Sequence, residues 1–217
     1  MKPLAECLLY AFIDTAYLGG RVPEDVAREL CHGGADLIQV RAKNKPLAEI
    51  REMGERILPI TQRAGVWLVI NDHLSVALEI GAPACHLGQE DFFHAGYRHR
   101  SGLIPPGSTL KIGLSTHAPE QAEQSVAAGA DYIAVGPVFR TATKPSAKPV
   151  TLNYVRWAAS HLAAPWFAIG GITLENLDAV LEAGARRICV VSALLNSTDL
   201  AAACRKFRDR LTAHNVP

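Results

Sequence analysis

One ten-residue segment, GPVFRTATKP at 136–145, carries two cations and two hydroxyls but no carboxylate. Arg140 and Lys144 flank Thr141 and Thr143, and a proline stands near each end of the segment. Hydroxyls, loop amides and a lysine are groups with which proteins bind phosphate. The segment therefore predicts an anion-binding loop.

A second basic segment, QVRAK at 39–43, follows a short apolar run. On an extended chain the side chains of Gln39, Arg41 and Lys43 alternate onto the same side. An arginine can bind a phosphate with two hydrogen bonds, and a lysine adds a mobile point charge. Taken alone, the segment is equally typical of solvated charges at the end of a strand.

Two aspartates, Asp72 and Asp91, follow the next two apolar runs along the chain. Paired carboxylates suit Mg²⁺, which takes few protein oxygens together with water and substrate phosphate. The alternative is structural: Asp72 could cap a helix starting near Leu74, and Asp91 could begin a turn. Their combination with phosphate-type cations favours the metal site.

An internal echo indicates the elements that must position these residues. GGADLIQV (33–40), AGADYIAV (128–135) and AGARRICVV (183–191) each place a glycine before a short apolar run, and an amphipathic stretch precedes each glycine. Glycine supplies the positive φ that ends a helix, and the apolar run is typical of a strand buried on both faces. The alternation predicts a parallel α/β architecture.

Eight such strands can be counted across the sequence. They are expected near 8–13, 36–40, 66–70, 84–87, 111–115, 131–135, 166–169 and 188–191. Eight β/α units in this length predict one (β/α)8 TIM barrel over residues 1–217, in which chemistry gathers at the carboxyl ends of the strands. A doubly wound sheet is the alternative, but no strand-adjacent G-x-G-x-x-G is present. Residues 92–108 are expected to be mostly loop, and we hypothesise that they act as a lid.

The rim of such a barrel also receives GLSTH (113–117), IGGI (169–172) and VVSA (190–193). Loops after the last two strands of this fold commonly bind phosphate. We therefore expect two anionic groups, one beside the carboxylates and one near Gly171 and Ser192. No histidine is predicted to be a catalyst, and His86 is expected to be a hydrogen-bonded core residue.

Bulk composition excludes several functional classes. The net charge is +1, from 22 basic and 21 acidic residues, so no broad field favours nucleic acid or a membrane surface. Five scattered cysteines without a C-x-x-C pair argue against a disulfide framework and a zinc site. No apolar run approaches a membrane span, which predicts a soluble, cytoplasmic protein.

The motifs QVRAK, ND, HLGQED, GLSTH, GPVFRTATK, IGGI and VVSA, in this order, resemble the thiamine-phosphate synthase (thiamine-phosphate pyrophosphorylase) family. The resemblance runs from about residue 8 to about residue 205. It implies a TIM barrel that joins 4-amino-2-methyl-5-(diphosphooxymethyl)pyrimidine to 4-methyl-5-(2-phosphoethyl)thiazole, giving thiamine phosphate and diphosphate. It also implies Mg²⁺ and a dissociative mechanism in which diphosphate leaves first.

The same resemblance implies the site residues. The catalytic residues would be Arg41, Lys43, Ser115 and Lys144. The substrate-binding residues would be Gln39, Val40, Arg41, Ala42, Lys43, Asn71, Ser115, Thr141, Ala142, Thr143, Lys144, Gly171, Val191 and Ser192. The metal ligands would be Asp72 and Asp91.

Other functions remain open at this level. A thiazole tautomerase of the same superfamily would share the barrel and isomerise thiazole phosphate. A non-catalytic barrel that binds phosphate esters, or another phosphosugar enzyme, is a further alternative. His73 stands where the family commonly has arginine, and its effect on specificity is open, as is a homo-oligomeric state.

Overall fold

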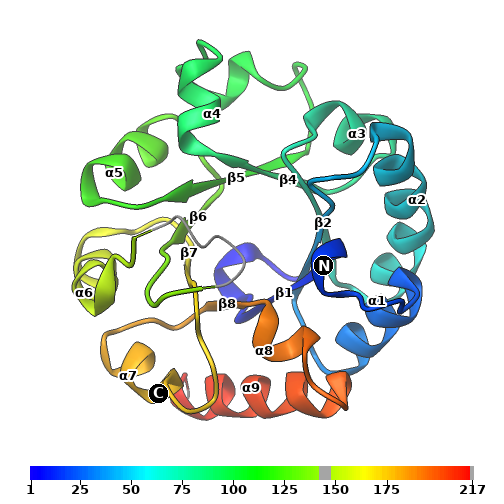
Figure 1. Cartoon of the computed structure of the whole chain (residues 1–217). Helices are drawn as coiled ribbons and strands as arrows, with labels where there is room; N and C mark the ends of the chain where they lie inside the picture. Colours follow the sequence, from blue (N-terminus) through cyan, green and yellow to red (C-terminus); the bar gives the residue numbers. More distant parts are fainter. Residues whose placement is uncertain (142–147, 216–217) are drawn as a thin grey trace.

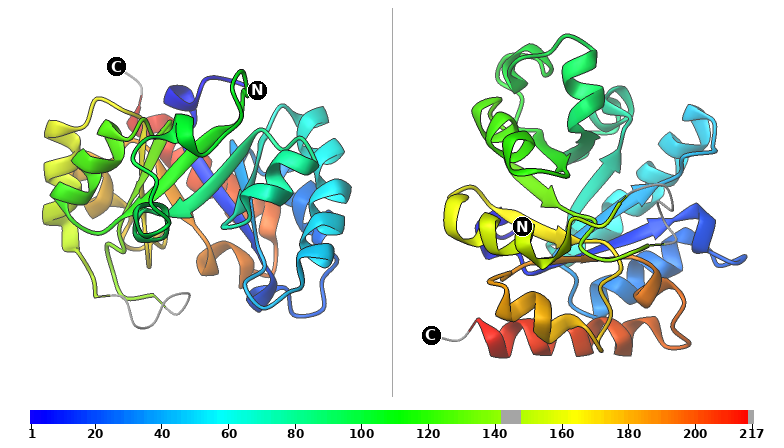
Figure 2. Two further views of the ribbon diagram at one scale, coloured as in Figure 1. Left: turned by 90° about the horizontal axis from the view of Figure 1, so that it is seen from above. Right: turned by 60° about the vertical axis from the view of Figure 1, so that its left-hand side comes forward.

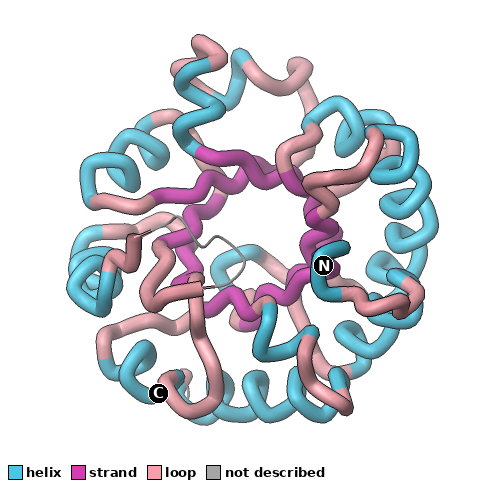
Figure 3. Tube along the Cα trace, in the orientation of Figure 1, coloured by secondary structure: helices cyan, strands magenta, loops and turns pink. Residues whose placement is uncertain are grey.

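The computed structural model describes residues 1–141 and 148–215, which form a closed barrel of parallel strands surrounded by helices (Figures 1 and 3). The strands are β1 (Leu9–Asp14), β2 (Leu37–Arg41), β3 (Trp67–Asn71), β4 (Ala84–Gly88), β5 (Lys111–Thr116), β6 (Tyr132–Val135), β7 (Trp166–Ile169) and β8 (Ile188–Val190). They pair in sequence order, and β8 closes on β1. The predicted TIM barrel is confirmed, with each expected strand found within one residue of its predicted bounds.

Helices fill the connections between the strands. They are α1 (Pro23–His32), α2 (Leu47–Ala64), α3 (Leu74–Glu79), α4 (Gln89–His94), α5 (Pro119–Ala127), α6 (Thr151–His161), α7 (Leu177–Glu182), α8 (Ser192–Leu195) and α9 (Leu200–His214), with short 3₁₀ turns η1 (Leu4–Glu6), η2 (Thr15–Tyr17) and η3 (Arg100–Gly102). Proline opens α1 and α5, where a missing N–H leaves no helical bond unmade. Within the described ranges, no helix combines the length and the apolar character needed to cross a bilayer.

Alternating side chains build two separate cores. On β1, Tyr10 and Phe12 point into the barrel, where they pack with residues such as Tyr132 and Phe167. The intervening residues of the strand, including Ile13, belong to the larger layer between strands and helices. The period of two therefore decides which strand residues can reach the barrel interior.

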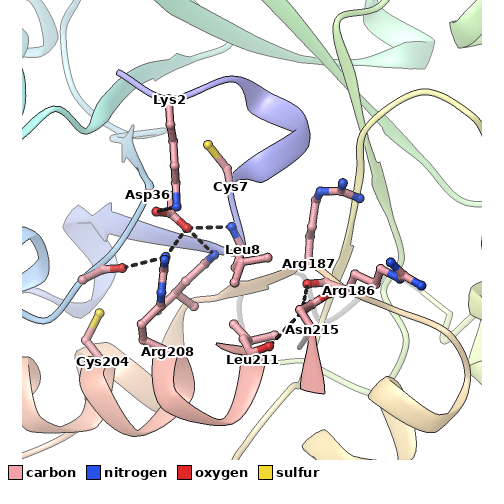
Figure 4. Close-up of polar contacts among 12 residues, drawn as sticks. Lys2, Cys7, Leu8, Asp36, Arg186, Arg187, Cys204, Arg208, Leu211 and Asn215 are labelled. Carbon is pink, nitrogen blue, oxygen red and sulfur yellow. Dashed lines mark hydrogen bonds and ion pairs between the residues drawn. The ribbon is translucent and has the colours of Figure 1, made fainter. Parts of the chain in front are cut away.

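The repeated segments 33–40, 128–135 and 183–191 have a structural explanation at the amino ends of the strands. Asp36 is 8% exposed, and its Oδ2 accepts the backbone N–H groups of Leu8 and Leu9 at 2.6 and 3.1 Å (Figure 4). Lys2 and Arg208 pair with the same carboxylate at 2.6 and 2.5 Å. One aspartate thus joins the starts of β1 and β2 to helix α9.

Asp131 repeats this arrangement in the second copy of the echo. Its Oδ2 accepts the N–H of Ile112 at 2.9 Å, and it pairs with Arg100 and Lys111 at 2.5 and 3.1 Å. In the third copy Arg186 stands at the position of the aspartate, and the next residue, Arg187, donates its Nε–H to the carbonyl of Ala5 at 3.1 Å. The repeated segment therefore stabilises the rim opposite the expected active site.

Candidate active site

A cavity of about 200 Å³ opens at the carboxyl ends of the strands and receives residues from all eight of them. The sequence-predicted residues whose atoms line this cavity are Gln39, Arg41, Lys43, Asn71, Asp72, Asp91, Ser115, Thr141, Gly171, Val191 and Ser192. The structure therefore brings together residues from distant parts of the chain. Their roles in binding and catalysis stay predictions.

Five predicted positions do not line the cavity in the described structure. Val40 and Ala42 are buried in the layer between strands and helices, because the pleat of β2 turns their side chains away from Gln39 and Arg41. Only their backbone groups remain for a ligand. The other three, Ala142, Thr143 and Lys144, lie outside the described residues.

Arg41 is held by a carboxylate that sequence reasoning missed. Its Nη1 lies 2.5 Å from Oδ2 of Asp14, and Asp14 is 1% exposed. The two residues are register partners on β2 and β1, and Asp14 also accepts the N–H of Ala16 at 3.0 Å. Asp14 directly follows the apolar run at 8–13, so the strand-end rule applied to Asp72 could have found it.

Lys43 and Asp72 form a much looser pair. Their charged atoms lie 3.7 Å apart, and the side chains are 54% and 34% exposed. Exposed pairs of this kind contribute little to stability, so both groups can turn to a charged ligand. Asp72 has a φ of 64°, a left-handed conformation that non-glycine residues adopt mainly at turns and functional sites. Helix α3 has no side-chain cap, so the capping alternative for Asp72 is wrong.

Asp91 lies in the first turn of α4 and is exposed at the cavity. Its carboxylate folds back against Gly88, where an added Cβ would lie 2.7 Å from Oδ2. Glycine at position 88 therefore leaves room for this carboxylate orientation. Across residues 1–141 and 148–215, no group of three or more histidine, cysteine or acidic residues converges as a metal site.

The floor of the cavity is polar although it is buried. Gln39, Tyr10, Tyr132, His86 and Ser115 follow one another in a continuous series of hydrogen bonds. Burial lowers the pKa of His86 to about 4, so the imidazole is neutral at physiological pH. Burial also raises the pKa of both tyrosines well above the usual value. The expectation of a hydrogen-bonded, buried His86 is confirmed.

The glycines after β7 accommodate the chain that follows β6. Val138 and Phe139 donate backbone N–H groups to the carbonyls of Ile169 and Gly170 at 2.8 and 3.0 Å. A Cβ on Gly171 would lie 2.9 Å from the Cβ of Phe139. The two loops therefore pack backbone to backbone, a role for glycine that sequence reasoning did not include.

Residues 92–108 run away from the cavity. Helix α4 ends at His94, and Arg100 reaches Asp131 at the start of β6 with a 2.5 Å ion pair. No residue of 92–108 lines the cavity. The segment joins the carboxyl end of β4 to the opposite rim, and this geometry argues against a lid.

Comparisons with known proteins agree with the geometry. A family model described as thiamine monophosphate synthase matches residues 9–194. The chain is 46% identical over 181 residues to a thiamine-phosphate synthase of Thermus thermophilus, covering 82% of this chain and 84% of that one. It is 37% identical over 209 residues to a thiamine-phosphate synthase of Halalkalibacterium halodurans, covering 96% and 97%.

Solved structures extend the similarity to three dimensions. Thiamine phosphate pyrophosphorylase from Pyrococcus furiosus matches with a TM-score of 0.83 at 27% identity, covering 99% of this chain and 100% of that one. A 3-hexulose-6-phosphate synthase matches with a TM-score of 0.62 at 17% identity, which shows the fold alone.

Proposed function

The chain belongs to the thiamine monophosphate synthase family, and from this premise we propose how its cavity condenses a pyrimidine diphosphate with a thiazole phosphate. The observation that carries the proposal is the arrangement of Arg41 and Lys43 beside Asp72 and Asp91 in one cavity. One cavity thus holds two cations that could bind a diphosphate and two carboxylates that could bind the metal ion accompanying it. The protein is accordingly a transferase, a thiamine-phosphate synthase.

The proposed reaction needs no nucleophilic side chain. The C–O bond between the pyrimidine methylene and the diphosphate breaks, and the electron pair leaves with the diphosphate. The thiazole nitrogen then supplies the pair for the new C–N bond to the methylene carbon. Cys189 lines the cavity, but burial raises its thiol pKa well above the usual value, so it stays protonated.

Arg41 and Lys43 would stabilise the charge that builds on the leaving diphosphate. Asp14 fixes the guanidinium of Arg41 in place, which limits the reorganisation needed when that charge develops. Lys43 has an exposed, weakly paired ammonium that can follow the departing group. Ser115 adds a hydroxyl at the same cavity. Lys144, outside the described residues, would complete this set.

The carboxylates fit Mg²⁺ better than a transition metal. Asp72 and Asp91 offer hard oxygen ligands at the cavity, and both are exposed enough to leave room for water and phosphate oxygens. A closed zinc site would need four ligands, among them histidine or cysteine. When bound, Mg²⁺ would neutralise charge on the diphosphate and so favour its departure.

The thiazole phosphate would occupy the opposite side of the cavity. Thr141, Gly171, Val191 and Ser192 lie there, on the loops after β6, β7 and β8. Loops after the last two strands commonly hold phosphate in this fold. We further propose a cytoplasmic location for this biosynthetic reaction.

Diphosphate release, with both substrates present and with or without Mg²⁺, tests the function. We expect release that depends on both substrates and on the metal, with thiamine phosphate formed in equal amount. Isomerised thiazole without diphosphate would favour the tautomerase. Saturable binding without any product, under every metal condition, would favour a non-catalytic binding barrel. Light scattering on the same preparation would test whether the protein is a homo-oligomer.

A further inference from the structure

Five side chains from five strands form one hydrogen-bonded series across the barrel interior. Gln39 Nε2 donates to Tyr10 Oη at 2.5 Å, and the two tyrosine hydroxyls of Tyr10 and Tyr132 lie 3.0 Å apart. Tyr132 Oη lies 3.2 Å from Nδ1 of His86, and Nε2 of His86 lies 2.8 Å from Oγ of Ser115. The two ends, Gln39 and Ser115, both line the cavity.

With the amide nitrogen of Gln39 as the donor to Tyr10, the number of protons fixes the direction of this series. Each hydroxyl has one proton to donate, and a neutral imidazole has one N–H and one acceptor nitrogen. Because Tyr10 accepts from Gln39, its own proton goes to Tyr132, whose proton then goes to Nδ1 of His86. Nε2–H of His86 is left to donate to Ser115. If Tyr132 donated to Tyr10 instead, the proton of Tyr10 would have no acceptor among the described contacts, a costly state for a buried group.

A glycine in the middle of β5 makes the series sterically feasible. Gly113 is the register partner of His86 on one side and of Tyr132 on the other. A Cβ at Gly113 would overlap the ring of Tyr132 and lie 2.5 Å from its hydroxyl oxygen. Glycine weakens a strand interior and there often marks a close approach. Here it lets the Tyr132 ring cross β5 to reach His86.

We infer that Tyr10, Tyr132 and His86 are positioning residues, which couple Gln39 to Ser115 and give the two ends opposite hydrogen-bonding characters. With its nitrogen bound to Tyr10, Gln39 presents the amide oxygen as an acceptor to the cavity. With its oxygen occupied by His86, Ser115 presents its hydroxyl proton as a donor. A heteroaromatic ring that bears an amino group and ring nitrogens offers the matching donor and acceptor. This assignment rests on the proposed function, since the aminopyrimidine is its substrate.

The tautomer of His86 is the first test, and it needs no turnover. In the full-length protein labelled with ¹⁵N-histidine, we expect His86 to show the Nε2–H tautomer at pH 7.5, with Nδ1 as a hydrogen-bond acceptor. Tyr132→Phe should move the Nδ1 resonance toward that of an unbonded acceptor and leave Nε2 protonated. An Nδ1–H tautomer in the unsubstituted protein would overturn the direction, whether or not the protein releases diphosphate.

A double-mutant cycle tests the coupling. Tyr10→Phe and Tyr132→Phe each break the same series, so each should lower kcat/KM for the pyrimidine diphosphate about tenfold. Because the second break removes nothing further, the double variant should also lose about tenfold, whereas independent contributions would multiply to about a hundredfold. KM for the thiazole phosphate should stay unchanged.

A matched control separates this effect from the loss of a buried hydroxyl in general. Tyr154 is 4% exposed and shares a 2.7 Å hydroxyl–hydroxyl hydrogen bond with Thr116, outside the series. Tyr154→Phe should leave kcat/KM within about twofold. A multiplicative double variant, or single variants with unchanged kcat/KM, would overturn the coupling. If no turnover exists at all, the proposed function fails, and the tautomer still decides the inference.

Discussion

Asp14 and Arg41 occupy matched positions at the ends of neighbouring strands, and their charged atoms lie 2.5 Å apart. The carboxylate is nearly inaccessible, whereas the guanidinium lines the cavity. A buried acid therefore holds a basic group at the place where an anion is expected. The pairing makes Arg41 a fixed part of the site instead of a solvated surface charge.

Asp14→Asn should reduce both catalysis and stability. The amide keeps the shape of the carboxylate but loses the charge that holds Arg41, so we expect kcat/KM to fall tenfold or more, with a loss of about 2 kcal/mol in unfolding free energy. Steady-state kinetics and urea unfolding measure both. Asp25→Asn removes an exposed ion pair with Arg28 and is the matched control, with both quantities near those of the unsubstituted protein.

Asp91→Asn should abolish most activity without unfolding the protein. The side chain is exposed, so the unfolding free energy should change by less than about 0.5 kcal/mol. Loss of a metal ligand should lower kcat at least a hundredfold and raise the Mg²⁺ concentration that gives half-maximal rate. Asp209→Asn, on the exposed face of α9, is the control. An Asp91→Asn enzyme with an unchanged Mg²⁺ dependence would contradict the metal assignment.

Gly171→Ala should disturb the contact between the loops after β6 and β7. The added Cβ would clash with Phe139, and the alanine would have to keep the backbone φ of 64° that glycine adopts here. We therefore expect about 2–3 kcal/mol of destabilisation and a raised KM for thiazole phosphate. Gly65→Ala is a close control, because Gly65 has a φ of 68° and open space around it. It should lose only about 1 kcal/mol, with unchanged kinetics. Equal losses in both variants would argue against the loop contact.

Stability should depend on pH through His86. Its pKa falls from the usual 6.5 to about 4 on folding, so between these values the unfolded chain binds the additional proton. The contribution is fully present above pH 6.5 and is lost as pH falls toward 4, by about 3 kcal/mol. Urea unfolding at pH 7.5 and 4.5, in EDTA, should show a smaller difference for His86→Gln than for the unsubstituted protein.

An exposed histidine provides the control for that experiment. His94 lies at the end of α4 and is exposed. His94→Gln should keep the pH dependence of the unsubstituted protein. Parallel curves for His86→Gln and the unsubstituted protein would show that His86 does not carry this dependence.

Asp36→Asn should affect stability alone. Four groups meet its carboxylate at the amino rim, so the amide would lose two ion pairs and weaken the joint between β1, β2 and α9. We expect a loss of about 3 kcal/mol, since the carboxylate is buried. KM for both substrates should be unchanged. A changed KM would mean that the loss of contacts at the amino rim alters substrate binding at the carboxyl rim.

The sequence predicted the barrel and most of the cavity for the same reason. Parallel strands buried on both faces leave continuous apolar runs, and polar residues directly after those runs must meet at one rim. Asp72, Asp91 and Ser115 were found in this way. Asp14 obeys the same rule, but a lone aspartate carries no distinctive pattern until its register with Arg41 is known.

Other features could not be predicted because they depend on contacts across the barrel. The series from Gln39 to Ser115 joins residues up to 122 positions apart in a single bond, and no local pattern encodes such a contact. Gly113 is likewise explained only by the ring of Tyr132 from the next strand. Sequence spacing identifies faces and rims, whereas partners across the interior require the closed barrel.

The carboxylate of Asp36 has a practical consequence for handling this protein. It binds Lys2 and Arg208 at the rim remote from the cavity, and the first residues of the chain and the end of α9 lie on that side (Figure 2). A fusion partner, an affinity tag or a surface linker attached at either end would therefore project away from the cavity mouth. The protein can be immobilised through its ends with the substrate entrance facing the solution.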